Sequence, residues 1–156
     1  MAVSPIPAGY HSVTPYIYVK SSADAIAFYV KAFGAVETMR LKMPDGSIGH
    51  AEIQIGDSRV MLSDENPAWG NKSPTTLGGN SGGFCIYVPD VDAAFATAVA
   101  AGATVKMPVS DQFYGDRSGS VIDPFGHTWM IATHKEDMTP DVMQQRMDEF
   151  MKSAPK

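Results

Sequence analysis

The chain has one cysteine, a modest share of charged residues and no long hydrophobic run. The single thiol, Cys85, excludes an intramolecular disulfide and is typical of a reducing cytoplasm. The apolar runs are too short to span a membrane, and residues 1–10 lack the basic start and apolar centre of a signal peptide. We therefore expect a cytoplasmic protein without a membrane partner.

Basic residues are also scarce, and they do not cluster. Lys and Arg number 12 against 17 Asp and Glu, which gives a formal net charge of −5 over 156 residues. Proteins that bind nucleic acid normally carry a basic patch, so we expect no nucleic-acid partner. The hydrophobic content of 44% and the length instead fit a globular chain with one sizeable core.

The hydrophobic pattern divides the chain into two similar halves. In the first half, Val13 to Lys20 alternates as a strand does, and the apolar residues between Ala23 and Phe33 recur at helical spacing. Three further strands are predicted before the half ends. The second half repeats this order, and its segment Ile86-Tyr87-Val88 echoes Ile17-Tyr18-Val19. The sequence thus predicts two copies of a βαβββ unit.

This duplication predicts an α+β fold in which the two βαβββ modules form a cupped mixed sheet around a shared cavity. The modules cover 13–64 and 83–134, within a single domain at 13–134. Residues 1–12 form an N-terminal arm, and residues 65–82, rich in Pro and Gly, form a long linker loop. Residues 135–156 supply a C-terminal helix and tail, with an apolar stripe of Met143, Met147, Phe150 and Met151.

Several short motifs accompany the repeat. The turn at 123–127, Asp-Pro-Phe-Gly-His, lies between two strands near the end of the second module. With the duplicated modules, it resembles the vicinal oxygen chelate superfamily, which includes glyoxalase I, extradiol dioxygenases, fosfomycin-resistance enzymes and bleomycin-binding proteins. The chain looks most like the glyoxalase/bleomycin-resistance branch related to PhnB-like proteins. The other matching segments are Pro15–Val19, Ala25–Tyr29, Gly49–Ile53, Val60–Glu65 and Tyr114–Arg117.

The resemblance bears directly on metal binding. Metal-dependent members of the superfamily place His, Gln or Glu near the middle of the first and last strand of each module. Alignment on the helix starts and turns puts Thr14, Leu62, Gly83 and Met130 at these positions. None of them is a normal ligand of a divalent metal. The comparison therefore implies that the usual metal site is absent, and we expect no metal and no other cofactor.

The same register predicts the lining of the cavity. Tyrosine rings, Met and Leu would make an apolar surface on which a ligand can stack, with a few hydroxyl groups for orientation. The alternative is that these side chains fill a solid core. The residues predicted to face the cavity and bind a ligand are Thr14, Tyr16, Tyr18, Leu62, Cys85, Tyr87 and Met130.

Polar candidates accompany this apolar set. His50, Glu52 and Gln54 alternate on one strand, so a His–Glu hydrogen bond can tune the imidazole for proton transfer or ligand contact. The alternative is a solvated strand face or a purely structural pair. Arg117 could bind a ligand carboxylate or phosphate, or it could form a salt bridge with Asp116 or Asp123.

These features support two hypotheses. The first is a metal-free protein of the bleomycin-resistance type that sequesters a small molecule, such as an antibiotic or a metabolite. The alternative is a glyoxalase-like lyase, isomerase or dioxygenase that uses His50 and Glu52 as catalytic residues. Members of the superfamily commonly dimerise, so the resemblance also implies a homodimer. The stripe on the last helix would then pack against its own domain or against a second copy.

Overall fold

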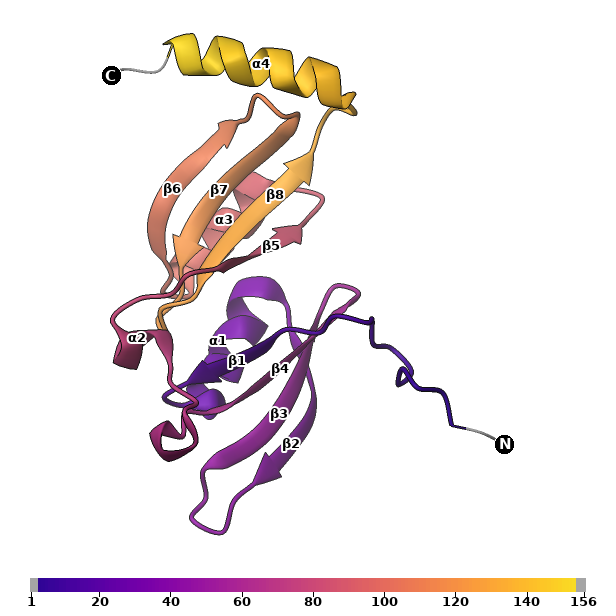
Figure 1. Cartoon of the computed structure of the whole chain (residues 1–156). Helices are drawn as coiled ribbons and strands as arrows, with labels where there is room; N and C mark the ends of the chain where they lie inside the picture. The colour runs from indigo at the N-terminus through magenta and orange to yellow at the C-terminus, as the bar shows by residue number, and fades with distance from the viewer. Residues whose placement is uncertain (1–2, 154–156) are drawn as a thin grey trace.

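The chain folds as two successive βαβββ modules followed by a C-terminal helix (Figure 1). A computed structural model describes residues 3–153, so the first two residues of the predicted arm and the last three of the tail lie outside the described part. The predicted α+β fold is confirmed. Its elements are β1 (Tyr16–Val19), α1 (Ser22–Phe33), β2 (Val36–Lys42), β3 (Ile48–Ile55), β4 (Ser58–Asp64), η1 (Pro67–Trp69), α2 (Pro74–Leu77), β5 (Gly83–Tyr87), α3 (Val91–Ala100), β6 (Thr104–Asp111), β7 (Asp116–Ile122), β8 (Thr128–His134) and α4 (Pro140–Ser153).

Each module has its own four-stranded mixed sheet, instead of sharing one cupped sheet. The strand orders are β1-β4-β3-β2 and β5-β8-β7-β6, and in each sheet the first strand runs parallel to the fourth. Helices α1 and α3 contact each other and cover the same side of the two sheets (Figure 1). The opposite side of each sheet carries no helix, and we call it the open face.

The helices α1 and α3 begin in the same local way. Ser21 accepts a hydrogen bond from the Asp24 amide at the start of α1, and Asp90 accepts one from the Ala93 amide at the start of α3. These side chains satisfy amide groups that have no partner within the helix. Gly34 ends α1 with a φ of 64°, a left-handed conformation that glycine adopts without steric cost.

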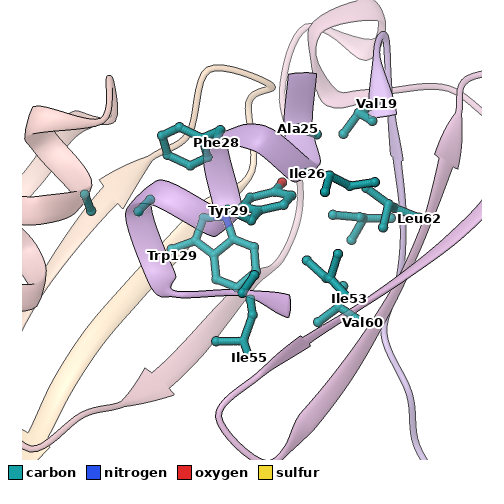
Figure 2. Packing of buried hydrophobic residues seen from close by; sticks show 14 of the residues in the cluster. Val19, Ala25, Ile26, Phe28, Tyr29, Ile53, Ile55, Val60, Leu62 and Trp129 are labelled. Atoms are coloured by element: carbon teal, nitrogen blue, oxygen red, sulfur yellow. The ribbon is translucent and has the colours of Figure 1, made fainter. Parts of the chain in front are cut away.

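The core of the first module lies between α1 and its sheet. Figure 2 shows Ile53, Val60 and Leu62 facing Ile26 and Tyr29 of α1. Leu62 is 0% exposed. Its predicted place in the ligand cavity is therefore wrong.

The error is one of phase. The error lies on β4, because Tyr16 of β1 pairs with Met61 there and Leu62 pairs with the buried Ile17. Because side chains alternate between the faces of a strand, a shift of one residue moves each of them to the other side. On β4, Met61 and Ser63 therefore belong to the open face, and Leu62 belongs to the core.

A buried carboxylate joins the two modules. Asp123, in the turn between β7 and β8, accepts hydrogen bonds from the Tyr29 hydroxyl at 2.7 Å and the Trp129 indole at 2.9 Å. Its other oxygen accepts from the backbone amides of Phe125 and His127. Because Tyr29 belongs to α1 of the first module, this turn fixes the modules to each other as well as closing its own hairpin.

The linker and the C-terminal helix add short local structure. The linker contains η1 and α2, and the Glu65 carboxylate accepts from the Ser73 amide at 2.8 Å, so the predicted structureless loop is partly ordered. Helix α4 packs at the tip of the second module, where Phe150 stacks on Phe113 at 5.5 Å. No α4 residue is buried. No helix in the range 3–153 is long and apolar enough to cross a membrane.

Candidate functional site

A chain of hydrogen bonds crosses the open face of the first sheet. The Tyr16 hydroxyl on β1 lies 3.0 Å from His50 Nδ1 on β3, and His50 Nε2 lies 3.3 Å from Glu52 Oε1. Tyr10, in the arm before β1, donates its hydroxyl to the other oxygen of Glu52. Tyr18 places its ring 5.3 Å from that of Tyr16. The face thus combines a fixed carboxylate, an imidazole and two neighbouring aromatic rings that are tilted by 38° to each other.

The electrostatics of this cluster centre on Glu52. Burial by itself raises the pKa of Glu52, but the hydrogen bonds from Tyr10 and His50 outweigh it and leave the pKa below the ordinary value. Burial and the neighbouring Glu52 charge raise the pKa of Tyr10. Near neutral pH, Glu52 is therefore an ionised acceptor and Tyr10 is a neutral donor.

Arg59 completes the cluster near the start of β4. Its guanidinium carbon lies 5.5 Å from the centre of the Tyr10 ring, a cation–π geometry, and one terminal nitrogen donates to Thr38 Oγ1. Its Nε is buried and has no hydrogen-bond partner among residues 3–153. Gln54, predicted to bind ligand, instead donates to the Gly56 carbonyl at 2.9 Å.

Sequence reasoning missed Tyr10 and Arg59. Tyr10 lies in an arm without hydrophobic periodicity, and its partner Glu52 is 42 residues away. Only the path of the arm across the sheet brings them together. The alternation on β4 could have indicated Arg59 once the strand phase was known, because Arg59 pairs with Gln54 on β3.

A second polar cluster occupies the open face of the other sheet. Tyr87 donates its hydroxyl to Asp116 at 2.9 Å, and His134 Nδ1 lies 2.7 Å from the same carboxylate. His134 Nε2 lies 3.0 Å from Asp137. Asp116 is only 5% exposed. His134 ends β8 and pairs directly with Asp116 at the start of β7, so this contact depends on the register of two strands.

This cluster shifts the pKa values of its members. The hydrogen bond to Asp116 raises the pKa of Tyr87 to about 12. Hydrogen bonds to Asp116 and Asp137 raise the pKa of His134 above its ordinary value of 6.5. Burial, and then the Asp116 charge, raise the pKa of Cys85, which nevertheless has an exposed side chain. Cys85 therefore lies on the open face as a largely protonated thiol.

Arg117 does not face either cluster. It pairs with Thr133 of β8, on the side opposite to Asp116 and Ser118. Its guanidinium contacts Asp92 of α3 at 2.8 Å and Asp111 at 3.2 Å, and these carboxylates raise its pKa. The predicted ligand contact is wrong because adjacent strand residues point to opposite faces. The salt bridge exists, but with partners other than Asp116 and Asp123.

The remaining candidates do not surround one shared cavity. One groove, of about 800 Å³, lies between the modules and is lined in part by Thr14, Cys85 and Tyr87. A smaller groove of about 330 Å³ beside the linker is lined in part by Tyr16 and Tyr18. Thr14 precedes β1, and its hydroxyl lies 3.4 Å from the His11 carbonyl oxygen. The predicted lining residues are thus divided between two grooves, and the groove between the modules joins residues of both halves.

Comparison with known proteins identifies the family. The model of the Glyoxalase/Bleomycin resistance protein/Dioxygenase superfamily matches residues 9–131. The chain belongs to this superfamily. It is 44% identical over 150 residues to the uncharacterised protein Rv0887c of Mycobacterium tuberculosis, covering 94% of this chain and 86% of that one.

Solved structures agree with this assignment. The Arabidopsis thaliana protein At5g48480 superposes with a TM-score of 0.63 at 28% identity, covering 79% of this chain and 98% of the other. The PhnB protein of Bacillus cereus superposes with a TM-score of 0.58 at 16% identity, covering 79% and 99%. At that identity the PhnB likeness concerns the fold alone.

The superfamily's usual metal positions can now be located on the open faces. Tyr16 pairs with Met61 across the first and last strands of one module, and Cys85 pairs with Met130 in the other. None of these residues is a His, Gln or Glu. Within residues 3–153, no group of three or more His, Cys, Asp or Glu side chains is placed to hold a metal ion. The residues present do not fit the metal site of the metal-dependent members.

Proposed function

We propose that the protein binds a small organic molecule on the open face of the first sheet, without a metal, and sequesters it as bleomycin-resistance-type proteins do. The observation that carries this proposal is the connected array of Tyr16, His50 and Glu52 on a face exposed to solvent. On a face that is merely solvated, water can satisfy such side chains, and they do not need to form hydrogen bonds with one another. Here the carboxylate gives a directional acceptor beside the neighbouring rings of Tyr16 and Tyr18.

A second copy of the chain would enclose the ligand. Small-molecule sites usually bury most of the ligand surface, and neither open face does so alone. Large apolar side chains are also exposed there, including Tyr16 at 41% and Tyr87 at 63%. Extended apolar surfaces of this kind favour association. We therefore propose a homodimer that covers the open faces, with the stripe on α4 as a further contact.

Metal analysis and a thermal-shift screen test this function together. We expect protein purified without chelators to contain no stoichiometric metal, and Ni²⁺, Zn²⁺, Fe²⁺ and Mn²⁺ to leave its Tm unchanged. Compounds from a library of drugs and metabolites should raise Tm in the wild type but not in His50→Ala. His11→Ala is the matched control, because His11 is exposed and makes no side-chain contact with the array. Stoichiometric metal that disappears in His50→Ala would contradict the proposal.

The geometry also favours a second candidate, a glyoxalase-like lyase, isomerase or dioxygenase. His50 Nε2 lies 3.3 Å from Glu52, so the carboxylate can orient the imidazole for proton transfer. Mass spectrometry of stabilising compounds after incubation with the protein separates the two functions. A binding protein returns the compound unchanged. An enzyme yields product, and both His50→Ala and Glu52→Gln lower the rate.

The ligand class decides the biological role. If the stabilising compound is an antibiotic, expression of the chain in a susceptible bacterium should raise the inhibitory concentration, and His50→Ala should abolish this protection. If it is a metabolite, protection is absent. A cytoplasmic location remains a prediction from the sequence, and fractionation of the source cells tests it.

A further inference from the structure

The N-terminal arm is held to the first sheet by a single side chain. Residues 3–9 and 11–13 are all exposed, and only Tyr10 between them is partly buried. The segment contains no helix or strand, and its local contacts are a turn between Tyr10 and Pro7 and a hydrogen bond within residues 4–6. Removing Tyr10 from the sheet would therefore break few other contacts.

Tyr10 lies against the open face and contacts two charged side chains of the sheet, as a bound phenol would. Its hydroxyl donates to Glu52, and its ring lies under the Arg59 guanidinium at 5.5 Å. A carboxylate acceptor and a cation over an aromatic ring together recognise a phenol. The position adjoins the His50 end of the array, since His50 and Tyr10 bind the two oxygens of the same carboxylate.

Tyr10 satisfies only part of this position. Arg59 Nε is buried and has no partner among residues 3–153, because the tyrosine ring offers it no acceptor. A Cβ added to Gly9 would lie 3.8 Å from that nitrogen, so the backbone of the arm passes close to it. A compound with a hydroxyl for Glu52 and an acceptor for Arg59 would satisfy both groups, and an unpaired buried donor favours such an exchange.

We propose that the Glu52–Arg59 position is a binding subsite for a hydroxyaryl group with a second hydrogen-bond acceptor on its ring, and that Tyr10 fills this subsite in the free protein. The inference rests on the proposed function, because the subsite is the outer part of the same open face. It specifies the ligand as a hydroxyaryl compound and identifies Tyr10 as a side chain that competes with this ligand for the subsite.

Competition by Tyr10 has a measurable size. The apparent affinity of a ligand is reduced by the fraction of protein whose subsite is open. If Tyr10 occupies the subsite nine times in ten, its removal raises the apparent affinity about tenfold. A tethered side chain of this kind lowers affinity for every compound that uses the subsite, and for no others.

The test uses 3-hydroxyacetophenone as the probe, titrated into the full chain and followed by NMR chemical shifts. Acetophenone lacks the hydroxyl, and phenol lacks the acceptor. We expect Tyr10→Ala to bind the probe about tenfold more tightly than the wild type. Tyr10→Phe should lie between them, because it keeps the ring and loses the bond to Glu52. Ile6→Ala, an exposed change in the same arm, should bind as the wild type does.

The control compounds identify the groups. In the Tyr10→Ala background, acetophenone and phenol should each bind more weakly than the probe, and Glu52→Gln should remove the advantage of the hydroxyl. Equal or weaker binding of the probe by Tyr10→Ala would overturn the inference, as would no binding by any variant. If compounds from the thermal-shift screen still bind in a His50-dependent way, the proposed function survives that result.

Discussion

The hydrogen bond between Tyr29 and Asp123 supports a prediction about how the modules are held together. Tyr29→Phe removes one hydroxyl from a completely buried ring and leaves the shape of the core unchanged. The Asp123 carboxylate keeps its other donors, from Trp129 and from two backbone amides. The variant therefore reports the contribution of one bond between α1 and the turn of the second module.

The magnitude follows from the nature of the acceptor. A hydrogen bond to a charged group contributes about 1.5–3 kcal/mol to the free energy of unfolding. For a chain of this length, each kcal/mol corresponds to a Tm change of roughly 2–4 °C. We expect Tyr29→Phe to lower Tm by about 3–12 °C. Tyr16→Phe, whose hydroxyl lies near the surface beside His50, should change the stability by less than about 1.5 kcal/mol.

Thermal and urea unfolding at a fixed protein concentration measure the change. Fluorescence should be recorded in a Trp69→Phe background, because Trp69 is exposed in the linker and Trp129 alone then reports on the core. An unchanged or higher Tm in Tyr29→Phe would refute the argument that this bond joins the modules. A double-mutant cycle with Asp123→Asn then shows whether the coupling is specific to the pair.

Three further predictions concern the second module. The pKa of His134 is raised in the folded protein, so protonated His134 stabilises the fold fully below the ordinary pKa of 6.5, and this contribution is lost as the pH rises through the folded-state pKa. The Tm of the wild type should therefore fall from pH 6 to 8, and the Tm of His134→Gln should fall less. Gly115→Ala should destabilise the chain by at least about 1–2 kcal/mol and increase hydrogen exchange in α4, because φ is +93° and a Cβ would lie 2.5 Å from the Glu136 carbonyl. Because the pKa of Cys85 is raised, little thiolate is present at pH 7.5, and alkylation by iodoacetamide should be slow. Asp116→Asn removes a negative charge and should accelerate the reaction, and an equal rate in the variant and the wild type would exclude an effect of Asp116.

The sequence predicted the fold well because the fold depends on local and repeated signals. The caps at Ser21 and Asp90, the glycine at Gly34 and the turn at 123–127 each specify a boundary by the chemistry of a few adjacent residues. The repeated strand–helix order then indicated two modules. These signals do not specify how two finished sheets lie in space, so the separation of the sheets was not predicted.

The site was harder to predict because it depends on strand phase and on distant partners. A slip of one residue on β4 placed Leu62 on the same face as Tyr16 and left Met61, the true neighbour of Tyr16, unnoticed. His50 and Glu52 were found because both lie on one strand at a spacing of two. Tyr10 and Asp116 were missed as site residues, since their partners lie on other elements.

The two open faces are built on one plan that differs from that of the metal-dependent relatives. In each module a tyrosine of the first strand forms a hydrogen bond across the fourth strand, Tyr16 to His50 and Tyr87 to Asp116. The carboxylate of each network lies on the third strand, Glu52 on β3 and Asp116 on β7. The fourth-strand residue beside the crossing tyrosine is Met61 next to Tyr16 in the first module and the small Ala132 next to Tyr87 in the second. In both modules the carboxylate that accepts from a tyrosine therefore lies on the third strand. Variants on β3 and β7, instead of the usual ligand positions, are the ones expected to alter binding.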